Sequence, residues 1–358
     1  MSFAYFRLPH TRQVYRNRLT AEPEEIASLA ELNGRRGFVI APFAPSAECP
    51  VLLLPTEWEE ADINGDSPLT ASLIDAGYSD ERSRYAIDFE NCHAQLRDGT
   101  FSKIVLARCS QVTATEHLPA LTLFARACRK YPRMFVALFS TKRCGTWLVA
   151  TPEILVRGNG RDMQTMALAG TMRLSGRELG FDMEGSHIGQ NDIHWSTKNI
   201  KEQRYVETYI TECIEHYADD FTVEGPYTAR AGDLVHLRSD IRFRLGDTTH
   251  IGDLLNTLHP TPAVCGMPKE ATRDFIMHNE SAPRDYYSGF AGMLDPDGDT
   301  ALFVTLRCMK MEDVAAPDDC VAACRLYAGG GLLKDSTEQA EWDETEAKMN
   351  TMRQTFKA

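Results

Sequence analysis

The order of the apolar runs constrains the fold of this chain more than any other sequence feature. Residues 154–157 and 163–166 are apolar runs separated by Gly158-Asn159-Gly160, which predicts a β-hairpin. Further strand-like runs are residues 103–108, 135–139, 147–150, 235–245, 289–294 and 301–311. Helix-like segments are residues 82–98, 118–130, 198–217 and 269–278. This order predicts an α+β fold in which large, mostly antiparallel β-sheets pack as a sandwich with flanking helices.

No internal repeat, low-complexity tract or flexible linker divides the chain. Its 358 residues suffice for a large single domain or for two coupled ones. Residues 1–95 mix short apolar runs with prolines and carry no chemical motif, whereas residues 96–358 hold every motif considered below. Residues 176–197 are polar and aperiodic, which predicts a surface loop. We expect one integrated domain with residues 1–95 as its N-terminal part.

Charge and cysteine usage narrow the partners and the compartment. A net charge of −13 argues against nucleic acid and anionic membranes, because binding either needs a basic patch. The net charge does not argue against an anionic small substrate, because a few local cations or a metal can make the electrostatic potential of one site positive. None of the 10 cysteines forms Cys-x-x-Cys, and no signal peptide or apolar run of membrane length is present. These features predict a cytoplasmic protein.

The C-terminal segment places two carboxylates and a lysine at helical spacing. Glu341, Glu344 and Lys348 are three and four residues apart, so they share one helical face. The capping-box sequence Ser336–Gln339 predicts the helix start, and Tyr327–Gly331 just upstream predicts a glycine turn. Such a segment can hold a metal and an anion together. The alternative is a solvated helix with ordinary charge pairs.

A glutamate interrupts the apolar stripe of the helix predicted at 198–217. Val206, Ile210 and Cys213 form that stripe, and Glu202 falls on it at helical spacing. A carboxylate on a buried face is costly unless it is paired or bound to a metal. The alternative is a position at the rim, where the helix dipole favours the charge. If Glu202 meets Glu344, the two carboxylates form an oxygen-ligand site suited to Mg²⁺.

Two residues are candidates for proton transfer. Lys103 begins an apolar strand, and a lysine that faces a cleft can act as a base. The alternative is an edge-strand lysine that prevents aggregation. Glu153 directly follows a strand in Thr151-Pro152-Glu153, where a partly desolvated glutamate can act as an acid. The alternative there is a simple strand-ending turn.

Three further positions are candidates for substrate contacts. Leu168–Thr171 ends a strand with a glycine and a hydroxyl, which can bind an oxygen atom or merely terminate the strand. His259, before Pro260, is either a ligand contact or a satisfied core histidine. Arg307 lies within an apolar β-rich run, where a guanidinium needs a carboxylate partner from the protein or from a substrate.

Taken together, these segments resemble the chorismate-utilising enzymes, and most closely the isochorismate synthases. The matching motifs occur in the same order as in the family, over roughly residues 100–352. Each motif is a weak indication by itself, and the eight in order are a strong one. Cys265 and residues 182–197 depart from the common pattern. The matching stretches are Ser102–Arg108, Ala150–Glu153, Leu168–Thr171, Lys198–Glu202, Leu258–Pro268, Thr305–Cys308, Leu326–Gly331 and Glu341–Lys348.

The resemblance implies two large antiparallel sheets with one active site between them, where chorismate binds with its ring carboxylate on Mg²⁺. Lys103 resembles the base that activates water, and Glu153 the acid that protonates the departing hydroxyl. The residues that resemble metal ligands are Glu202, Glu344 and, in an outer position, Glu341. Those that resemble substrate contacts and pocket walls are Gly170, Thr171, His259, Ala263, Val264, Leu306, Arg307, Tyr327, Gly329 and Lys348.

The implied reaction is the reversible, Mg²⁺-dependent conversion of chorismate to isochorismate, with menaquinone biosynthesis favoured over siderophore biosynthesis. Anthranilate synthases generally lack a lysine at position 103, aminodeoxychorismate synthases often carry one at Ala169, and salicylate synthases usually lack the His259–Pro262 sequence. A salicylate synthase, an aminating paralogue and a non-catalytic chorismate-binding regulator are the alternatives. We expect a monomer or weak dimer without an obligatory glutaminase subunit.

Overall fold

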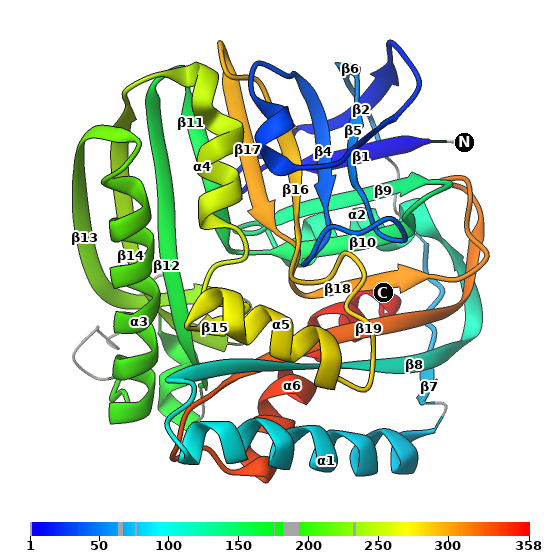
Figure 1. The fold of residues 1–358 in the computed structure, drawn as a ribbon. Helices are drawn as coiled ribbons and strands as arrows, with labels where there is room; N and C mark the ends of the chain where they lie inside the picture. Colours follow the sequence, from blue (N-terminus) through cyan, green and yellow to red (C-terminus); the bar gives the residue numbers. More distant parts are fainter. Residues whose placement is uncertain (1, 64–66, 76, 175, 182–192, 232–233) are drawn as a thin grey trace.

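Two large antiparallel sheets pack against each other in the computed structural model, with helices on their outer sides (Figure 1). The structure describes residues 2–63, 67–75, 77–174, 176–181, 193–231 and 234–358. In Figure 1 most strands of the first sheet run across the view, and most strands of the second run from top to bottom. The predicted α+β fold with antiparallel sheets is confirmed.

The strands of each sheet come from both halves of the chain. The first sheet has the order β15 (Gly266–Met267), β8 (Lys103–Pro119), β19 (Cys320–Leu332), β18 (Cys308–Met311), β10 (Gly145–Thr151), β9 (Phe135–Thr141), β1 (Phe3–Arg7), β2 (Val14–Leu19) and β6 (Thr56–Glu60), and β7 (Leu73–Asp75) also pairs with β8. The second has the order β13 (Ala218–Ala231), β14 (Leu234–Leu245), β12 (Asp162–Arg173), β11 (Ile154–Asn159), β17 (Asp299–Val304), β16 (Phe290–Leu294), β4 (Gly37–Ala41), β5 (Val51–Leu54) and β3 (Glu24–Ile26).

An aromatic core joins the two sheets. Phe135 of β9 stacks on Phe303 of β17 with ring centroids 4.3 Å apart, and Phe6 of β1 stacks on Phe38 of β4 at 6.5 Å. Such pairs stabilise the interface beyond the area that they bury. Because β1 pairs with β9 and β4 with β16, the N-terminal residues form part of both sheets.

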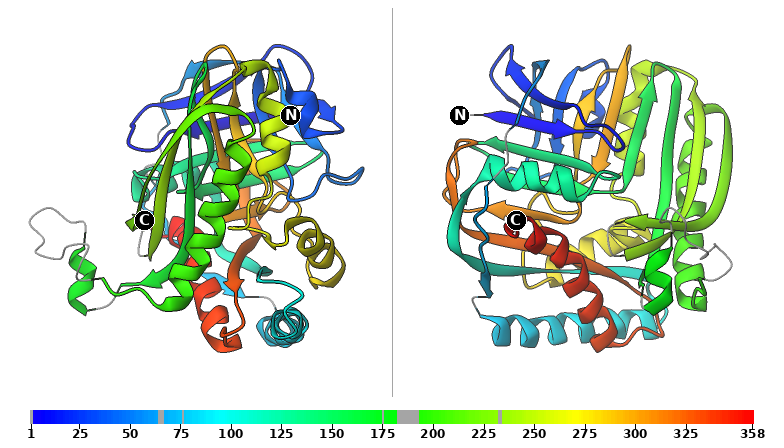
Figure 2. Two further views of the ribbon diagram at one scale, coloured as in Figure 1. Left: turned by 60° about the vertical axis from the view of Figure 1, so that its left-hand side comes forward. Right: turned by 180° about the vertical axis from the view of Figure 1, so that it is seen from behind.

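The helices cover the outer faces and place their buried sides against particular strands. α3 and α4 pack on the second sheet, whereas α1 and α6 pack beside β8 and β19 of the first. The rear view in Figure 2 shows α6 crossing β8 and β19 towards α1. The helices are α1 (Tyr78–Arg97), α2 (Ala120–Lys130), α3 (Thr197–Ile214), α4 (Ile251–Leu258), α5 (Lys269–Asn279) and α6 (Glu338–Arg353), with short 3₁₀ turns at Leu29–Leu32, Gly176–Gly180, Thr248–His250 and Gln354–Phe356.

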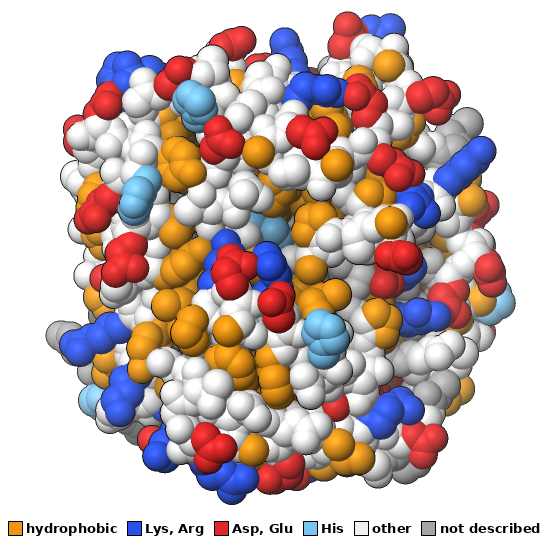
Figure 3. All heavy atoms as spheres, viewed as in Figure 1, with side chains coloured by type: hydrophobic (Ala, Val, Ile, Leu, Met, Phe, Trp, Pro, Cys, Tyr) orange, Lys and Arg blue, Asp and Glu red, His pale blue; other side chains and the backbone are white. Residues whose placement is uncertain are grey.

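The surface carries charges of both signs. On the face shown in Figure 3, basic side chains are interspersed with acidic ones. None of the helices in the described segments has both the length and the apolar character of a membrane span.

Several local predictions hold and others are wrong. The hairpin is confirmed, with Asn159 of β11 paired to Asp162 of β12. The predicted strand 301–311 is two strands, because Arg307 between them has φ 46° and interrupts the extended backbone. The strand at Leu168–Thr171 does not end there but passes through a β-bulge and continues to Arg173. α4 and β13 were not predicted.

The region before the C-terminal helix also differs from prediction. Tyr327–Gly331 is not a turn but lies within β19, with Gly329 paired to Ala107 of β8. The predicted capping box is absent, because Ser336 Oγ accepts a hydrogen bond from the Leu333 N–H and Thr337 is the N-cap residue. Of the predicted loop 176–197, residues 176–180 form a 3₁₀ turn, and residues 182–192 lie outside the described residues.

Candidate active site

One cavity lies where β8 and β19 of the first sheet meet β12 and β14 of the second. Most of the predicted site residues reach it, although they come from seven separate segments. The predicted residues that line it are Glu153, Gly170, Thr171, Glu202, Ala263, Val264, Leu306, Arg307, Tyr327, Gly329 and Lys348. Further lining residues within the matching stretches are Val105, Pro152, Leu168, Ala169, Ala328 and Gly331, and only His236 and Tyr287 were not indicated by the sequence.

Lys103 and Glu202 form a buried ion pair at the edge of this cavity. The Lys103 side chain is fully buried, and its Nζ lies 3.1 Å from Glu202 Oε1. The ammonium makes no well-aligned hydrogen bond within the described residues. Glu202 is 7% exposed on α3, so the predicted cost of its burial is offset by Lys103. The first sheet and the helix beside the second sheet therefore meet through this pair.

Glu153 lies on the wall of the cavity, where burial favours the protonated form of its carboxyl. It lies between β10 and β11 and is only 4% exposed. Burial raises the pKa of its carboxyl from the usual 4.5 to about 8, although Lys103, Lys348 and Arg307 partly oppose that rise. At neutral pH the carboxyl keeps its proton and can donate it.

Three carboxylates converge on the glycines of β19. A Cβ at Gly331 would overlap the carboxylate of Glu202, and a Cβ at Gly330 would lie 2.9 Å from Glu341 Oε2 and 3.9 Å from Glu344 Oε1. Only glycine therefore leaves room for these side chains from α3 and α6 beside the strand. The three predicted ligands come together, although the described residues contain no group of three His, Cys, Asp or Glu in metal-binding geometry.

Lysines balance the charge of this cluster. Lys198 of α3 forms an ion pair with Glu341, and Lys348 Nζ donates to Glu344 Oε1 at 2.7 Å and to Gly329 O at 2.8 Å. Burial and the neighbouring Glu344 raise the pKa of Glu341 despite Lys198. Burial would also raise the pKa of Glu344, but Lys348 and Lys198 lower it below its usual value. Glu341 Oε2 is buried without a hydrogen-bond partner among the described residues, which leaves an acceptor for a cation.

Arg307 faces the cavity with a histidine as its partner. His236 Nδ1 lies 3.2 Å from Gly170 O, and its Nε2 lies 2.7 Å from Arg307 NH2, which fits a neutral ring protonated on Nδ1. Burial and Arg307 hold the pKa of His236 well below 6.5. No salt bridge joins Arg307 to a carboxylate among the described residues, and burial lowers its pKa to about 10. Its guanidinium therefore keeps donors available for an anion.

His259 is not brought to the cavity lining. Its ring is 4% exposed, Nε2 lies 2.9 Å from Pro42 O, and burial lowers the pKa to about 4. The ring also contacts Phe290 edge-on at 5.1 Å. Both features match a satisfied core histidine, and the neighbouring Ala263 and Val264 line the cavity instead.

A buried ion pair absent from the sequence predictions supports one wall. Arg284 pairs with Glu280 and donates to the carbonyls of Val264 and Val105, each at 2.7 Å. Glu280 Oε1 accepts from the Ala107 N–H at 2.8 Å. The pair thus continues the hydrogen bonding of β8 where β15 ends. The sequence could have indicated this ion pair only through the spacing of four residues between Glu280 and Arg284. That spacing does not distinguish a buried ion pair from one on the surface.

The chain was also compared with known proteins. The family model described as "Chorismate binding enzyme" matches residues 58–357. This chain belongs to the chorismate-binding enzymes. It is 30% identical to isochorismate synthase DhbC of Bacillus subtilis over 76% of this chain and 67% of that protein. It spans between 58% and 67% of the length of three curated relatives that it matches.

Solved structures of this family show the same fold. DhbC of Bacillus anthracis, named 2,3-dihydroxybenzoate-specific, superposes with a TM-score of 0.81 at 21% identity, covering 99% of this chain and 95% of that one. MenF of Escherichia coli, named menaquinone-specific, gives 0.79 at 20% identity, with 100% and 89% covered. Their names point to two different uses of isochorismate.

Proposed function

We propose that this chain is an isochorismate synthase. Water attacks C2 of chorismate, the ring double bonds shift, and the C4 hydroxyl leaves with a proton, so that one water enters and one departs. Hydroxide is a poor leaving group and water a weak nucleophile, so the reaction needs an acid and a base. The observation that carries the proposal is the buried Glu153, protonated at neutral pH, in the same site as the buried Lys103. The names of the relatives support the same reaction.

The cations of the cavity support an anionic substrate. Arg307 has donors available for a carboxylate, and Lys348 lines the same cavity. Paired charge-assisted hydrogen bonds from Arg307 would hold a chorismate carboxylate in a fixed orientation. Tyr327, whose ring stacks on Tyr287 at 5.6 Å, forms a flat wall beside it. In the proposed reaction the Lys103 side chain acts as its neutral amine and takes the proton from the attacking water, and Glu153 gives its proton to the departing hydroxyl.

Mg²⁺ is the proposed cofactor. Glu202 and Glu344 would hold it, with Glu341 in an outer position. The fit is supported by the convergence of these carboxylates beside Gly330 and Gly331 and by the Glu341 Oε2 atom, which has no hydrogen-bond partner among the described residues. When bound, Mg²⁺ would neutralise a carboxylate of the substrate and orient it.

We propose a cytoplasmic enzyme that acts without a glutaminase subunit. All ten cysteines are free thiols, which suits a reducing compartment. The relatives include enzymes named for menaquinone and for 2,3-dihydroxybenzoate, so their names favour neither use of the product.

Proton NMR of the purified protein with chorismate and Mg²⁺, repeated with EDTA and with added ammonium, tests the proposal. We expect a magnesium-dependent mixture of chorismate and isochorismate that ammonium does not change. Salicylate and pyruvate would instead show a salicylate synthase, and an amino product an aminating enzyme. Chorismate bound without conversion would overturn catalysis. Glu202→Ala and Glu344→Ala should each abolish the magnesium-dependent rate, and an unchanged magnesium titration would contradict the ligand assignment.

A further inference from the structure

The face of β8 that points away from the cavity carries a buried arginine. Side chains alternate along a strand, so Lys103 and Val105 face the site, whereas Ile104, Leu106 and Arg108 face α1 and α6. Arg108 is 5% exposed, although it lies among the apolar side chains that pack these helices on the sheet. A buried guanidinium is costly unless its donors are all used, so its surroundings deserve a physical explanation.

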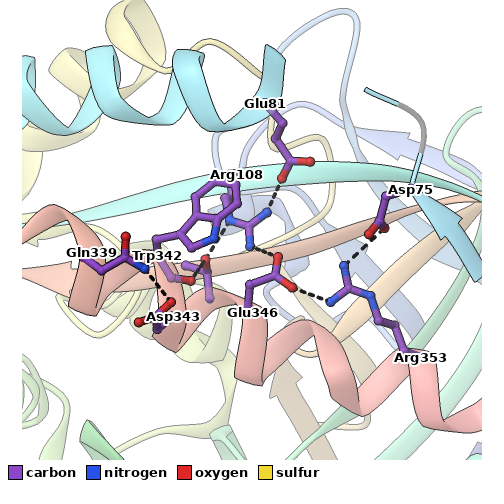
Figure 4. A network of polar contacts seen from close by, with 9 residues as sticks. Asp75, Glu81, Arg108, Gln339, Trp342, Asp343, Glu346 and Arg353 are labelled. Carbon is purple, nitrogen blue, oxygen red and sulfur yellow. Dashed lines mark hydrogen bonds and ion pairs between the residues drawn. The ribbon is translucent and has the colours of Figure 1, made fainter. Parts of the chain in front are cut away.

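Arg108 binds α1 and α6 at once. Its Nε donates to Thr345 Oγ1 at 2.6 Å, and its terminal nitrogens form ion pairs with Glu81 of α1 and Glu346 of α6. The guanidinium carbon also lies 3.7 Å from the centroid of the Trp342 ring. Figure 4 shows the arginine between the two helices, with Glu81 on one side and Glu346 on the other. The planar guanidinium of Arg108 therefore fixes the orientation of these side chains as well as neutralising the carboxylates.

The α6 residues that Arg108 contacts alternate with the residues of the site. Trp342 directly follows Glu341, and Thr345 directly follows Glu344. Their side chains leave the same helical turns on a different face, because successive residues are about 100° apart around a helix. A rotation or slide of α6 that breaks the Arg108 contacts therefore moves both carboxylates relative to β19.

Two other arginines form ion pairs with α6 residues, and their side chains are more exposed than that of Arg108. Arg353 of α6 pairs with Asp75 of β7 at 3.4 Å and, within its own helix, with Glu346 at 2.8 Å, and Arg82 of α1 pairs with Glu338. The side chains of Arg353 and Arg82 are 19% and 28% exposed, against 4% for Arg108. Solvent screens exposed pairs more than buried ones, so among these arginine ion pairs those of Arg108 restrain the helix most strongly. Lys348, which bonds Gly329 O, and Lys198, which pairs with Glu341, add contacts within the site itself.

We propose that Arg108 is a positioning residue that sets the rotation of α6 and thereby holds Glu341, Glu344 and Lys348 against the glycines of β19. The placement of α6 stands on the contacts alone, whereas its catalytic consequence rests on the proposed function. Displacements of about 1 Å in such a group lower activity severely. Residues that support metal ligands from behind typically change metal affinity or activity by about 10- to 100-fold when they are replaced.

Arg108→Lys tests the proposal, because it keeps the positive charge and removes the guanidinium that contacts Thr345, Glu81 and Glu346 together. Arg7→Lys is a matched control. Arg7 is 2% exposed and bonds the carbonyls of Tyr131 and Met134 at 2.6 and 2.8 Å, and it belongs to β1 rather than to the strands beside α6. For both variants we would measure urea unfolding, Mg²⁺ affinity by calorimetry, kcat and KM for chorismate, and a crystal structure.

We expect Arg108→Lys to weaken Mg²⁺ binding and to lower kcat/KM, each by about tenfold or more. Arg7→Lys should lose stability while both quantities stay within about twofold, since the hydrogen bonds of Arg7 reach neither α6 nor β19. In the crystal structure of Arg108→Lys, Glu341 and Glu344 should be displaced from β19. Thr345→Val removes the Nε contact together with the hydrogen bond from Thr345 Oγ1 to Trp342 O, and leaves both Arg108 ion pairs in place. It should show a smaller loss of the same kind, and it keeps the proposal testable if Arg108→Lys does not fold.

The proposal is overturned if Arg108→Lys loses stability but keeps its Mg²⁺ affinity, its kcat/KM and the position of α6. That result would make Arg108 a residue of the helix packing alone. If the wild-type protein neither binds Mg²⁺ nor converts chorismate, the proposed function fails instead. The crystal structures of Arg108→Lys and Thr345→Val then still decide whether Arg108 holds α6 in place.

Discussion

Replacing Glu153 with glutamine separates the stability cost of the proposed acid from its catalytic role. Burial raises the pKa of the Glu153 carboxyl from 4.5 to about 8. A glutamine at this position keeps nearly the same shape and does not titrate. At about 1.36 kcal/mol per pKa unit, the raised pKa costs the folded protein roughly 5 kcal/mol above pH 8 and roughly 3 kcal/mol at pH 7.

The sign of the pH dependence follows from where the proton is held. Below pH 4.5 the folded and unfolded states both keep the proton, so wild type and Glu153→Gln should be about equally stable. Between pH 4.5 and about 8 the unfolded carboxyl ionises while the folded one stays protonated. The wild-type stability therefore falls relative to the variant as the pH rises, and the full difference is reached above pH 8.

Urea unfolding at pH 5, 7 and 9 in EDTA measures this difference, and the NMR assay measures turnover. We expect Glu153→Gln to be more stable at pH 9, to bind chorismate and to lose turnover by about 100-fold or more. Glu90→Gln, at a side chain 65% exposed, should change neither quantity. Equal pH dependence of wild type and Glu153→Gln would refute the raised pKa. Full activity of the variant would refute the acid role.

The remaining predictions concern the base, the glycine strand and the anion contact. Lys103→Ala should abolish turnover while chorismate still binds, as seen by NMR, and full activity would contradict the base assignment. Gly331→Ala should push the Glu202 carboxylate aside and weaken Mg²⁺ binding measured by calorimetry, whereas Gly246→Ala, whose Cβ would lie 3.4 Å from its nearest neighbour, should not. Arg307→Gln should raise KM for chorismate more than tenfold, because a charge-assisted pair contributes about 1.5–3 kcal/mol, and an unchanged KM would place the substrate carboxylate elsewhere.

Local pattern determined much of the fold from the sequence. The hairpin at 154–166, the helix at 269–278 and the long strand at 235–245 were predictable, because period-two and helical spacing express burial on one face. The element that misled was the glycine run of β19. Three successive glycines favour a turn in isolation, yet pairing with β8 and the close approach of Glu202 and Glu341 require glycine in a strand.

The candidate site was predictable as a set of residues and not as a geometry. The motifs indicated Lys103, Glu153 and Arg307 as candidate site residues. The resemblance of these motifs to the chorismate-utilising enzymes supplied the expected role of each residue. The lone histidine in a predicted strand, His236, gave no such signal, because only the fold brings it to Arg307 and Gly170. His259, beside a recognisable proline motif, instead bonds the backbone of Pro42.

Sequence by itself therefore determined which side chains this protein can use, since composition, spacing and motif order depend on neighbours along the chain. Tertiary structure alone decided how they act. Segments that are distant in sequence together raise the pKa of Glu153 and pair Lys103 with Glu202. The contacts between Arg108 and α6 also join distant segments. Burial and electrostatic interaction depend on distance in space, and no local pattern encodes that distance.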